Sequence, residues 1–148
     1  MKFTNSLIKG KLLKRYKRFF ADIKVNNKIV TAHCPNTGSM QGLLNKGNKV
    51  FITEHNDPKR KLKFTLEIIK ANKRYVGVNT HRANKIVNHG LENKLIDEFK
   101  TIKNIKPEFK FSDDTRFDFI CDKFLIEVKN VTLFRDCLLY TSPSPRDT

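Results

Sequence analysis

Three charged side chains near the C-terminal end of the sequence have a spacing that suits metal-assisted chemistry on a phosphate. Asp118 precedes the dipeptide Asp122-Lys123, and Glu127 and Lys129 follow it. If the flanking segments pair as a hairpin around this dipeptide, Asp118 lies directly opposite Glu127. Side chains alternate between the two faces of a strand, so Lys129 then shares the face of Glu127. The pattern predicts two carboxylates and one ammonium group on a single face.

Two carboxylates that oppose each other on paired strands repel, at a cost of up to about 1 kcal/mol. A divalent cation between Asp118 and Glu127 would remove this repulsion. Mg²⁺ or Mn²⁺ suits such oxygen ligands, because Mg²⁺ is typically held by one or two carboxylates together with waters and phosphate oxygens. Lys129 would then orient the attacking water or neutralise charge on the phosphate. The alternative is an ordinary solvated hairpin face on which Lys129 relieves the carboxylate pair.

Two basic clusters in the first half of the chain suit the backbone of a nucleic acid. In the first, cations alternate with aromatic residues, a mixture that holds phosphates while a ring stacks on a base. The second lies in a loop between expected strands, where phosphate contacts are easily made. We expect both clusters to lie on one surface, and Phe19 and Phe20 to be buried in the core. The clusters are Lys14, Arg15, Tyr16, Lys17 and Arg18, and Lys59, Arg60, Lys61 and Lys63.

The most distinctive local sequence is the loop that contains His33, Cys34, Asn36, Thr37, Gly38 and Ser39. Backbone amides near Gly38 would be able to hold an anion. A buried structural turn, in which Asn36 and Thr37 bond to backbone groups, accounts for the same residues equally well. His33 and Cys34 are adjacent and would point to opposite faces of a strand, which argues against a shared metal ion.

The composition indicates a polyanionic partner and a cytoplasmic protein. The 30 Lys and Arg residues against 15 Asp and Glu give a net charge of +15, which attracts polyanions such as DNA. The three cysteines form no Cys-x-x-Cys pair, which argues against a disulfide framework or a structural zinc site and favours the reducing cytoplasm. A membrane-spanning helix needs an apolar run of about 18 residues, and the sequence contains none. We therefore expect no membrane partner.

The first 80 residues predict a small β-barrel. Short segments rich in β-branched and aromatic residues alternate with turn sequences such as Asn26-Asn27 and Asn56-Asp57-Pro58. So many strands in so short a stretch fit an oligonucleotide-binding-type (OB-like) barrel. The expected strands cover residues 7–20, with a break near Leu13, and 21–25, 29–33, 49–54, 64–70 and 74–77.

A different pattern begins near residue 84. Apolar residues recur there at steps of three and four, which predicts an amphipathic helix of about 14 residues; they are Ile86, Val87, Leu91, Leu95, Ile96 and Phe99. Expected strands follow at 102–111, 116–121 and 124–131. The change indicates a domain boundary near residue 80 and the start of an α/β domain over 81–136. Residues 137–148 resemble translated sequencing adapter, and we expect them to be non-native.

Five sequence blocks, in order, resemble the bacterial sugar fermentation stimulation protein A family. They are KRYKRF at 14–19, TAHCPNTGSM at 31–40, NDPKRKL at 56–62, VGVNT at 76–80 and EVKNVTL at 127–133. The resemblance implies an N-terminal OB-like barrel, a PD-(D/E)xK nuclease-like domain truncated after Leu133, DNA binding and a role in regulating sugar metabolism. It also places Asp118, Glu127 and Lys129 on the nuclease signature.

In related nucleases, the helix before the first strand often supplies another acidic residue. Glu92 is the candidate here, although Asn88 and His89 stand closer to the expected position, and Glu108 is either a further ligand or a surface residue. The sequence thus favours a DNA-binding protein that grips the phosphate backbone. A Mg²⁺- or Mn²⁺-dependent DNA endonuclease is the alternative, with the truncated chain expected to be inactive. An RNA- or anion-binding barrel module is a third hypothesis.

Overall fold

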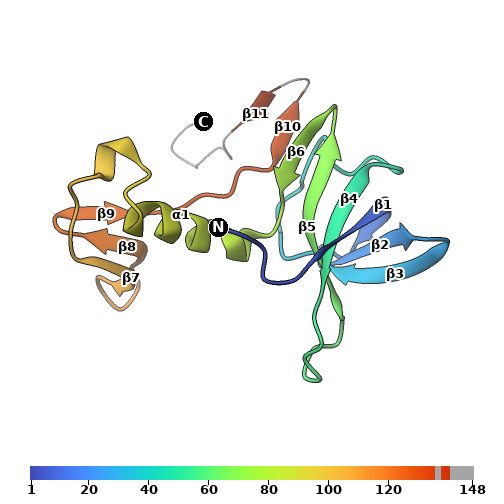
Figure 1. The fold of residues 1–148 in the computed structure, drawn as a ribbon, viewed down its shortest axis with the longest axis horizontal. Coiled ribbons are helices and arrows are strands. Elements are labelled where there is room, and N and C mark those ends of the chain that lie inside the picture. The colour runs from blue at the N-terminus through green and yellow to red at the C-terminus, as the bar shows by residue number, and fades with distance from the viewer. Residues whose placement is uncertain (136–137, 141–148) are drawn as a thin grey trace. The chain divides into compact units, whose positions relative to one another are not determined.

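The computed structural model describes residues 1–135 and 138–140, which form two compact units (Figure 1). One unit holds Lys2–Thr80 and the described residues from Asn130 onward, and the other holds Met1 and His81–Lys129. Most of 137–148, which we expected to be non-native, lies outside the described residues. Within that stretch, β11 (Leu138–Tyr140) pairs with β10 (Leu133–Arg135).

The first unit is a closed barrel with one extra strand. Its strands are β1 (Leu7–Tyr16), β2 (Phe20–Val25), β3 (Lys28–His33), β4 (Lys49–Glu54), β5 (Phe64–Ala71) and β6 (Arg74–Gly77). They run in the order β3-β2-β1-β4-β5-β6, and a parallel pairing of β3 with β5 closes the first five into a barrel. This arrangement confirms the expected OB-like fold. The break expected near Leu13 is a register shift within a single strand, β1.

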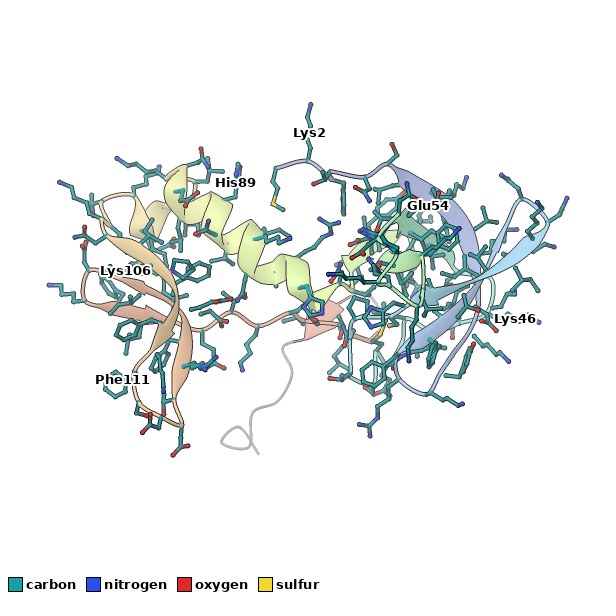
Figure 2. All side chains as sticks on the ribbon, turned by 90° about the horizontal axis from the view of Figure 1, so that it is seen from below. Lys2, Lys46, Glu54, His89, Lys106 and Phe111 are labelled. Atoms are coloured by element: carbon teal, nitrogen blue, oxygen red, sulfur yellow. The ribbon has the colours of Figure 1, made fainter. Side chains whose placement is uncertain are left out.

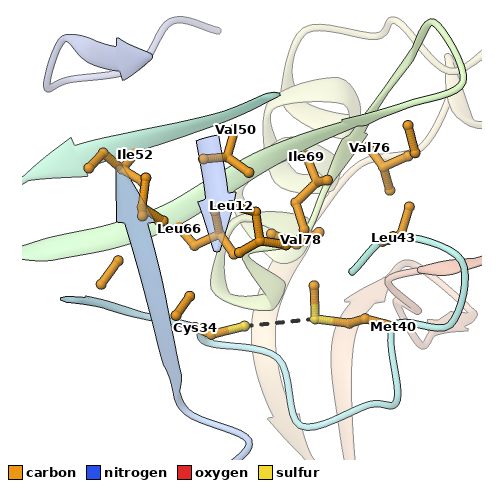
Figure 3. Close-up of a cluster of buried hydrophobic side chains, with 14 residues drawn as sticks. Leu12, Cys34, Met40, Leu43, Val50, Ile52, Leu66, Ile69, Val76 and Val78 are labelled. Carbon is orange, nitrogen blue, oxygen red and sulfur yellow. Dashed lines mark hydrogen bonds between the residues drawn. The ribbon is translucent and has the colours of Figure 1, made fainter. Parts of the chain in front are cut away.

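Alternation along the strands builds the barrel core. In β1 and β2, buried Leu12, Ala21 and Ile23 alternate with residues that contact solvent. They belong to one cluster with buried side chains of β4 and β5, and Figure 3 shows Leu12 among them, beside Val50 and Leu66. This core cluster is apolar, although β4 and β5 also bury the polar side chains of Thr53, Thr65 and Glu67. We therefore expect polar ligands on the outside of the barrel or at its loops.

The second unit packs one helix on a small antiparallel sheet. It contains α1 (Thr80–Glu92), a 3-10 turn, η1 (Asp97–Phe99), and the sheet β7-β8-β9, formed by β7 (Ile105–Lys110), β8 (Arg116–Cys121) and β9 (Phe124–Ile126). Leu91 and Ile102 are buried together with Phe119 and Cys121 of the sheet. This helix and sheet confirm the expected truncated nuclease-like α/β fold. Within the described residues, no helix is long and apolar enough to span a membrane.

The helix is shifted relative to the expected one. It begins at Thr80, four residues before Asn84, and ends at Glu92, so the apolar periodicity continues beyond it into η1. Its end is fixed by Lys94, which has a φ of 56° and donates its N–H to the carbonyl of Leu91. The N–H of Leu95 bonds to the carbonyl of Gly90, which completes a Schellman motif.

Candidate nucleic-acid interface and carboxylate site

Two loops of the barrel meet at one pocket. The turn between β1 and β2 and the loop between β4 and β5 both contribute to a pocket of about 260 Å³. It is lined by Phe19, Phe20, His33, Arg60, Lys61 and Leu62. We call it the loop pocket. The structure thus places members of the second basic cluster beside the aromatic residues that directly follow the first.

Phe19 is not in the core, and this expectation was wrong. Its side chain is 45% exposed, and its ring stacks on that of His33 with 6.4 Å between centroids. The cause is the turn: Lys17 and Arg18 have positive φ angles, and Tyr16 pairs directly with Phe20, so Phe19 lies outside the barrel ladder. Phe20 is half-buried and stacks on Tyr16 at 5.5 Å.

The residues of the first basic cluster have different environments. Lys14 is exposed, with its Nζ 3.9 Å from Asp22 and 5.1 Å from the centre of the Tyr16 ring. Arg15 instead donates hydrogen bonds to the carbonyls of Asn36, at 2.7 Å, and Arg18, at 3.1 Å. Arg15 therefore braces the backbone beside the loop pocket. Lys17 and Arg18, in the turn itself, are exposed.

The second basic cluster lies on an ordered loop. Asp57 accepts the N–H of Lys59 on its side chain and that of Arg60 on its carbonyl, which makes the loop turn back on itself. The guanidinium of Arg60 donates to Thr65 Oγ1 at 2.6 Å, while Lys59, Lys61 and Lys63 are exposed. Side chains that end in nitrogen project from the outside of the barrel (Figure 2). Phosphate groups are therefore the ligands that suit this surface.

The loop that contains Cys34 and Asn36 has the geometry of a structural turn. Asn36 is buried; it donates to the carbonyl of Val78 at 3.2 Å and accepts the N–H of Gly38 at 3.0 Å. Cys34 is fully buried beside Met40 (Figure 3), and burial raises the pKa of its thiol. Because Asn36 takes the Gly38 amide, that amide does not face a ligand. The carbonyl of Ser39 accepts a hydrogen bond from Arg15 at 3.4 Å.

The hairpin of β8 and β9 brings Asp118 close to the residues that follow β9. Its register pairs Phe119 with Ile126 and Cys121 with Phe124, so the turn consists of Asp122 and Lys123, as expected. Phe119 and Ile126 contribute to the buried layer under α1. Extension of this register by one step places Asp118 opposite Glu127, on the other face.

Strand β9 is shorter than expected, ending at Ile126 instead of residue 131. The reason lies in the side chain of Asp118, which accepts the N–H of Val128 at 2.6 Å and the side-chain amide of Asn84 at 2.7 Å. A carboxylate thus takes the place of the next backbone acceptor in the ladder. Glu127 and Lys129 therefore follow the strand as exposed residues, not as members of it.

Lys129 links the acidic residues of this group. Its ammonium forms an ion pair with Glu127, and both side chains are mostly exposed. The pKa of Lys129 is raised, first by the hydrogen bond and charge of Glu127 and then by the charge of Asp118. Both carboxylates thus act on the same ammonium. The described part of the chain contains no group of three His, Cys, Asp or Glu residues arranged to hold a metal ion.

The contact from α1 to Asp118 is made by an amide, the side chain of Asn84, and not by a carboxylate. Glu92 is the last residue of the helix and is exposed. Glu108 lies on β7 between the pairs Pro107–Phe119 and Phe109–Phe117, hence across from Asp118, with a φ of 54°. Sequence reasoning missed Asn84 because it began the helix there, four residues late.

Comparison with known proteins extends over nearly the whole chain. The family model "SfsA N-terminal OB domain" matches residues 13–78, and "Sugar fermentation stimulation protein RE domain" matches residues 81–144, past Leu133. A "Sugar fermentation stimulation protein homolog" of Pelagibacter ubique is 61% identical over 92% of this chain and 60% of its own length. The homolog of Alteromonas mediterranea is 46% identical over 90% of this chain and 61% of its own length. The chain thus spans about 60% of these relatives.

A solved structure has the same fold. The structure of Pyrococcus furiosus SfsA in complex with Ca²⁺ matches with a TM-score of 0.69 and 21% sequence identity. The match covers 82% of this chain and 51% of that one. The two chains therefore share the succession of a barrel and a helix with a small sheet.

Proposed function

Because the chain belongs to the sugar fermentation stimulation protein family, we propose that it binds DNA in the cytoplasm, chiefly through backbone phosphates, at the loop pocket. The observation that carries this proposal is the meeting of an exposed aromatic ring, Phe19, with Arg60 and Lys61 at one pocket. In this proposal DNA binding belongs to residues 1–80, and residues 81–136 form the nuclease-like part.

Physical chemistry supports a nucleic acid at this place. OB folds bind oligonucleotides on strands 2 and 3 and on the loops between strands 1 and 2 and between strands 4 and 5. The loop pocket is built from that pair of loops. Cations there hold phosphates, and an exposed ring such as Phe19 stacks on a base of any sequence. The net charge of +15 adds long-range attraction.

Salt dependence of binding tests this proposal. Each lost phosphate contact lowers the slope of log K against log salt by about 1. Replacing Lys59, Arg60 and Lys61 together by Ala should flatten the slope by about 3 in a mobility-shift titration. The matched control replaces Lys94, Lys106 and Lys123, exposed lysines of the other unit, and should change it little. An unchanged slope in the loop variant would place the DNA site elsewhere.

Competition separates DNA from RNA. A protein that binds the phosphate backbone of duplex DNA should keep the duplex bound when single-stranded RNA of equal length is added. Preferential transfer to RNA would favour the RNA- or anion-binding hypothesis.

A role in regulating sugar metabolism, which the family name suggests, requires selection of particular sites. Selection from random duplexes should then enrich one sequence, and an unenriched pool would argue against regulation by site choice.

A second function is supported by the carboxylate group. We propose that Asp118 and Glu127 bind Mg²⁺ or Mn²⁺ as part of a DNA endonuclease site, with Lys129 beside them. Two carboxylates suit such an ion, which completes its coordination with water and phosphate oxygens. When bound, the ion would stabilise negative charge on the phosphate. Asn84 and Val128 hold the Asp118 carboxylate in place, and protonated Lys129 supplies a fixed positive charge.

Metal binding and cleavage are tested separately. Mn²⁺ should raise the melting temperature of the wild-type chain, because a ligand that binds the folded state stabilises it. Glu127→Gln should abolish this rise, and Asp114→Ala, an exposed acid, should not. Because the chain spans 60% of its relative from Pelagibacter ubique, cleavage of supercoiled DNA is assayed on a version extended to full length. Cleavage that survives Asp118→Ala would exclude this site.

A further inference from the structure

Lysines lie side by side across four neighbouring strands of the barrel. Lys11 of β1 pairs with Lys24 of β2 on one side and with Lys49 of β4 on the other. The pairing of Val50 with Ile69, extended by one step, places Lys70 of β5 across from Lys49. We call Lys24, Lys11, Lys49 and Lys70 the lysine row. Lys9 lies two residues before Lys11 and so shares its outward face.

This arrangement is unfavourable for folding by itself. Like charges that are directly opposed on paired strands destabilise the sheet. The pKa of Lys49 is lowered, first by the charge of Lys9 and then by that of Lys70, as expected for ammonium groups on one face. In the part of the chain that the structure describes, no ion pair joins these lysines to a carboxylate. A merely solvated face would be more stable with acids placed among the lysines.

The row borders a hollow on the outside of the barrel. A cavity of about 450 Å³ is lined by Lys9, Gly10, Lys11, Lys24, Asn26, Asn27 and Lys49. Asn26 and Asn27 form the turn between β2 and β3 and add amide groups at the rim. Beyond the other end of the row, Tyr75 is 57% exposed, and the ammonium of Lys70 lies 5.1 Å from the centre of its ring. Cations and amides thus line one hollow, and an exposed aromatic ring lies beyond the far end of the row.

The spacing of the row suits a chain of phosphates. Neighbouring strands are about 4.8 Å apart, so the four lysines span about 14 Å. One strand of a duplex rises about 3.4 Å per nucleotide along the helix axis, so the row covers about four nucleotide steps. A narrow backbone can enter a hollow that a flat bilayer surface cannot follow. We propose that the lysine row binds the phosphodiester backbone of a nucleic acid, as a contact separate from the loop pocket.

The two surfaces lie at different places along β2. Phe20 of the loop pocket and Lys24 of the row are four residues apart, which is about 13 Å along a strand. One polyanion can therefore contact both surfaces. The proposal for the lysine row rests on the proposed DNA binding of the chain, because the row would add phosphate contacts to those of the loop pocket. It predicts that residues outside the two loops also contribute to the affinity for DNA.

The test neutralises the row and leaves the loops unchanged. Lys11→Gln, Lys24→Gln and Lys49→Gln are combined in the full chain and titrated with salt against a labelled duplex of about 20 base pairs. We expect the slope of log K against log salt to fall by about 3. The matched control, Lys94→Gln with Lys106→Gln and Lys123→Gln, removes the same charge from the other unit. It should leave the slope close to that of the wild type.

A second measurement shows whether the row variant is folded. Because like-charge repulsion is removed, its melting temperature should be equal to or above that of the wild type. If the wild type binds the duplex and the folded row variant keeps its slope, the row proposal is overturned and the loop pocket stands. A single Lys49→Gln variant repeats the test if the triple variant unfolds, with a fall of about 1 expected. A wild type that does not bind duplex DNA would overturn both proposals.

Discussion

The carboxylate of Asp118 accepts the backbone N–H of Val128 at 2.6 Å, and this contact ends strand β9. In a continued ladder, the N–H of Val128 would bond to a carbonyl of β8. Here the side chain of Asp118 accepts this N–H instead. The chain therefore leaves the sheet after Ile126, and Glu127 and Lys129 lie outside it. One carboxylate thus has two consequences: it shapes the backbone, and it positions the residues that share its charge environment.

Asp118→Ala should therefore lower the free energy of unfolding of the chain, in addition to weakening any metal binding at this site. Its loss leaves the N–H of Val128 and the amide of Asn84 without their partner, and an unsatisfied polar group that is partly buried costs about 1–3 kcal/mol. Urea unfolding measures the change. Asp114→Ala removes an exposed acid from the preceding loop and should change the free energy of unfolding by less than about 0.5 kcal/mol. Equal values for the two variants would contradict the role of the Val128 contact.

Much of the fold follows from alternation and turn chemistry in the sequence. The bounds of β4, β6 and β8 are those expected from the residues, and the register of the β8–β9 hairpin follows from the Asp122-Lys123 turn. These elements are local: each is set by a short pattern of apolar residues and by the turn next to it. Local patterns therefore predicted both the barrel and the hairpin that carries Asp118.

The errors arose where contacts distant in sequence decide the structure. The start of α1 at Thr80 lacks the apolar periodicity on which the expected helix was based, and Thr80 bonds to the carbonyl of Pro35. The length of β9 depends on Asp118, and the exposure of Phe19 depends on a turn with two positive φ angles. The lysine row was missed for a similar reason, because its members are separated in sequence and meet only through strand pairing.

Lys129 should remain protonated well into the alkaline range. Glu127, and to a lesser extent Asp118, raises its pKa above the ordinary value of 10.5. A raised lysine pKa contributes stability that is fully present below that ordinary value and is lost as the pH rises through the folded-state pKa. We therefore expect Lys129 to carry its positive charge at neutral pH.

An NMR titration of the Lys129 side chain checks this pKa. Glu127→Gln removes the largest cause of the shift and should move the titration of Lys129 to lower pH. Asp118→Asn should move it less, because Asp118 is the weaker cause. If neither variant changes the midpoint, the two carboxylates do not act on Lys129 in solution.

Arg15 should contribute more to the stability of the folded chain than its neighbour Lys14. Its guanidinium donates to the carbonyls of Asn36, Arg18 and Ser39, whereas Lys14 is mostly exposed. Arg15→Ala leaves these carbonyls without a charged donor and should cost about 1–3 kcal/mol in urea unfolding. Lys14→Ala should cost less than about 1 kcal/mol, because an exposed ion pair contributes little. A reversed order of the two variants would show that the bracing contacts are not formed.

Gly10 should tolerate no side chain, because β1 and β2 approach closely there. A Cβ added at Gly10 would lie 2.6 Å from Cγ2 of Ile23 and 2.9 Å from the carbonyl oxygen of Lys24. The second atom belongs to the backbone of β2 and cannot move aside, so β1 and β2 would have to separate. Gly10→Ala should therefore destabilise the barrel by about 1–3 kcal/mol.

The matched control for Gly10 is Gly77→Ala in β6. A Cβ at Gly77 meets no atom within 4 Å, and its φ is not in the left-handed region. This substitution should be neutral, or should stabilise the chain by up to about 1 kcal/mol, because alanine restricts the unfolded state more than glycine does. Thermal unfolding of both variants gives the comparison. Since Lys11 and Lys24 pair next to Gly10, separation of β1 from β2 should also weaken the salt dependence of DNA binding, and Gly77→Ala should leave it intact.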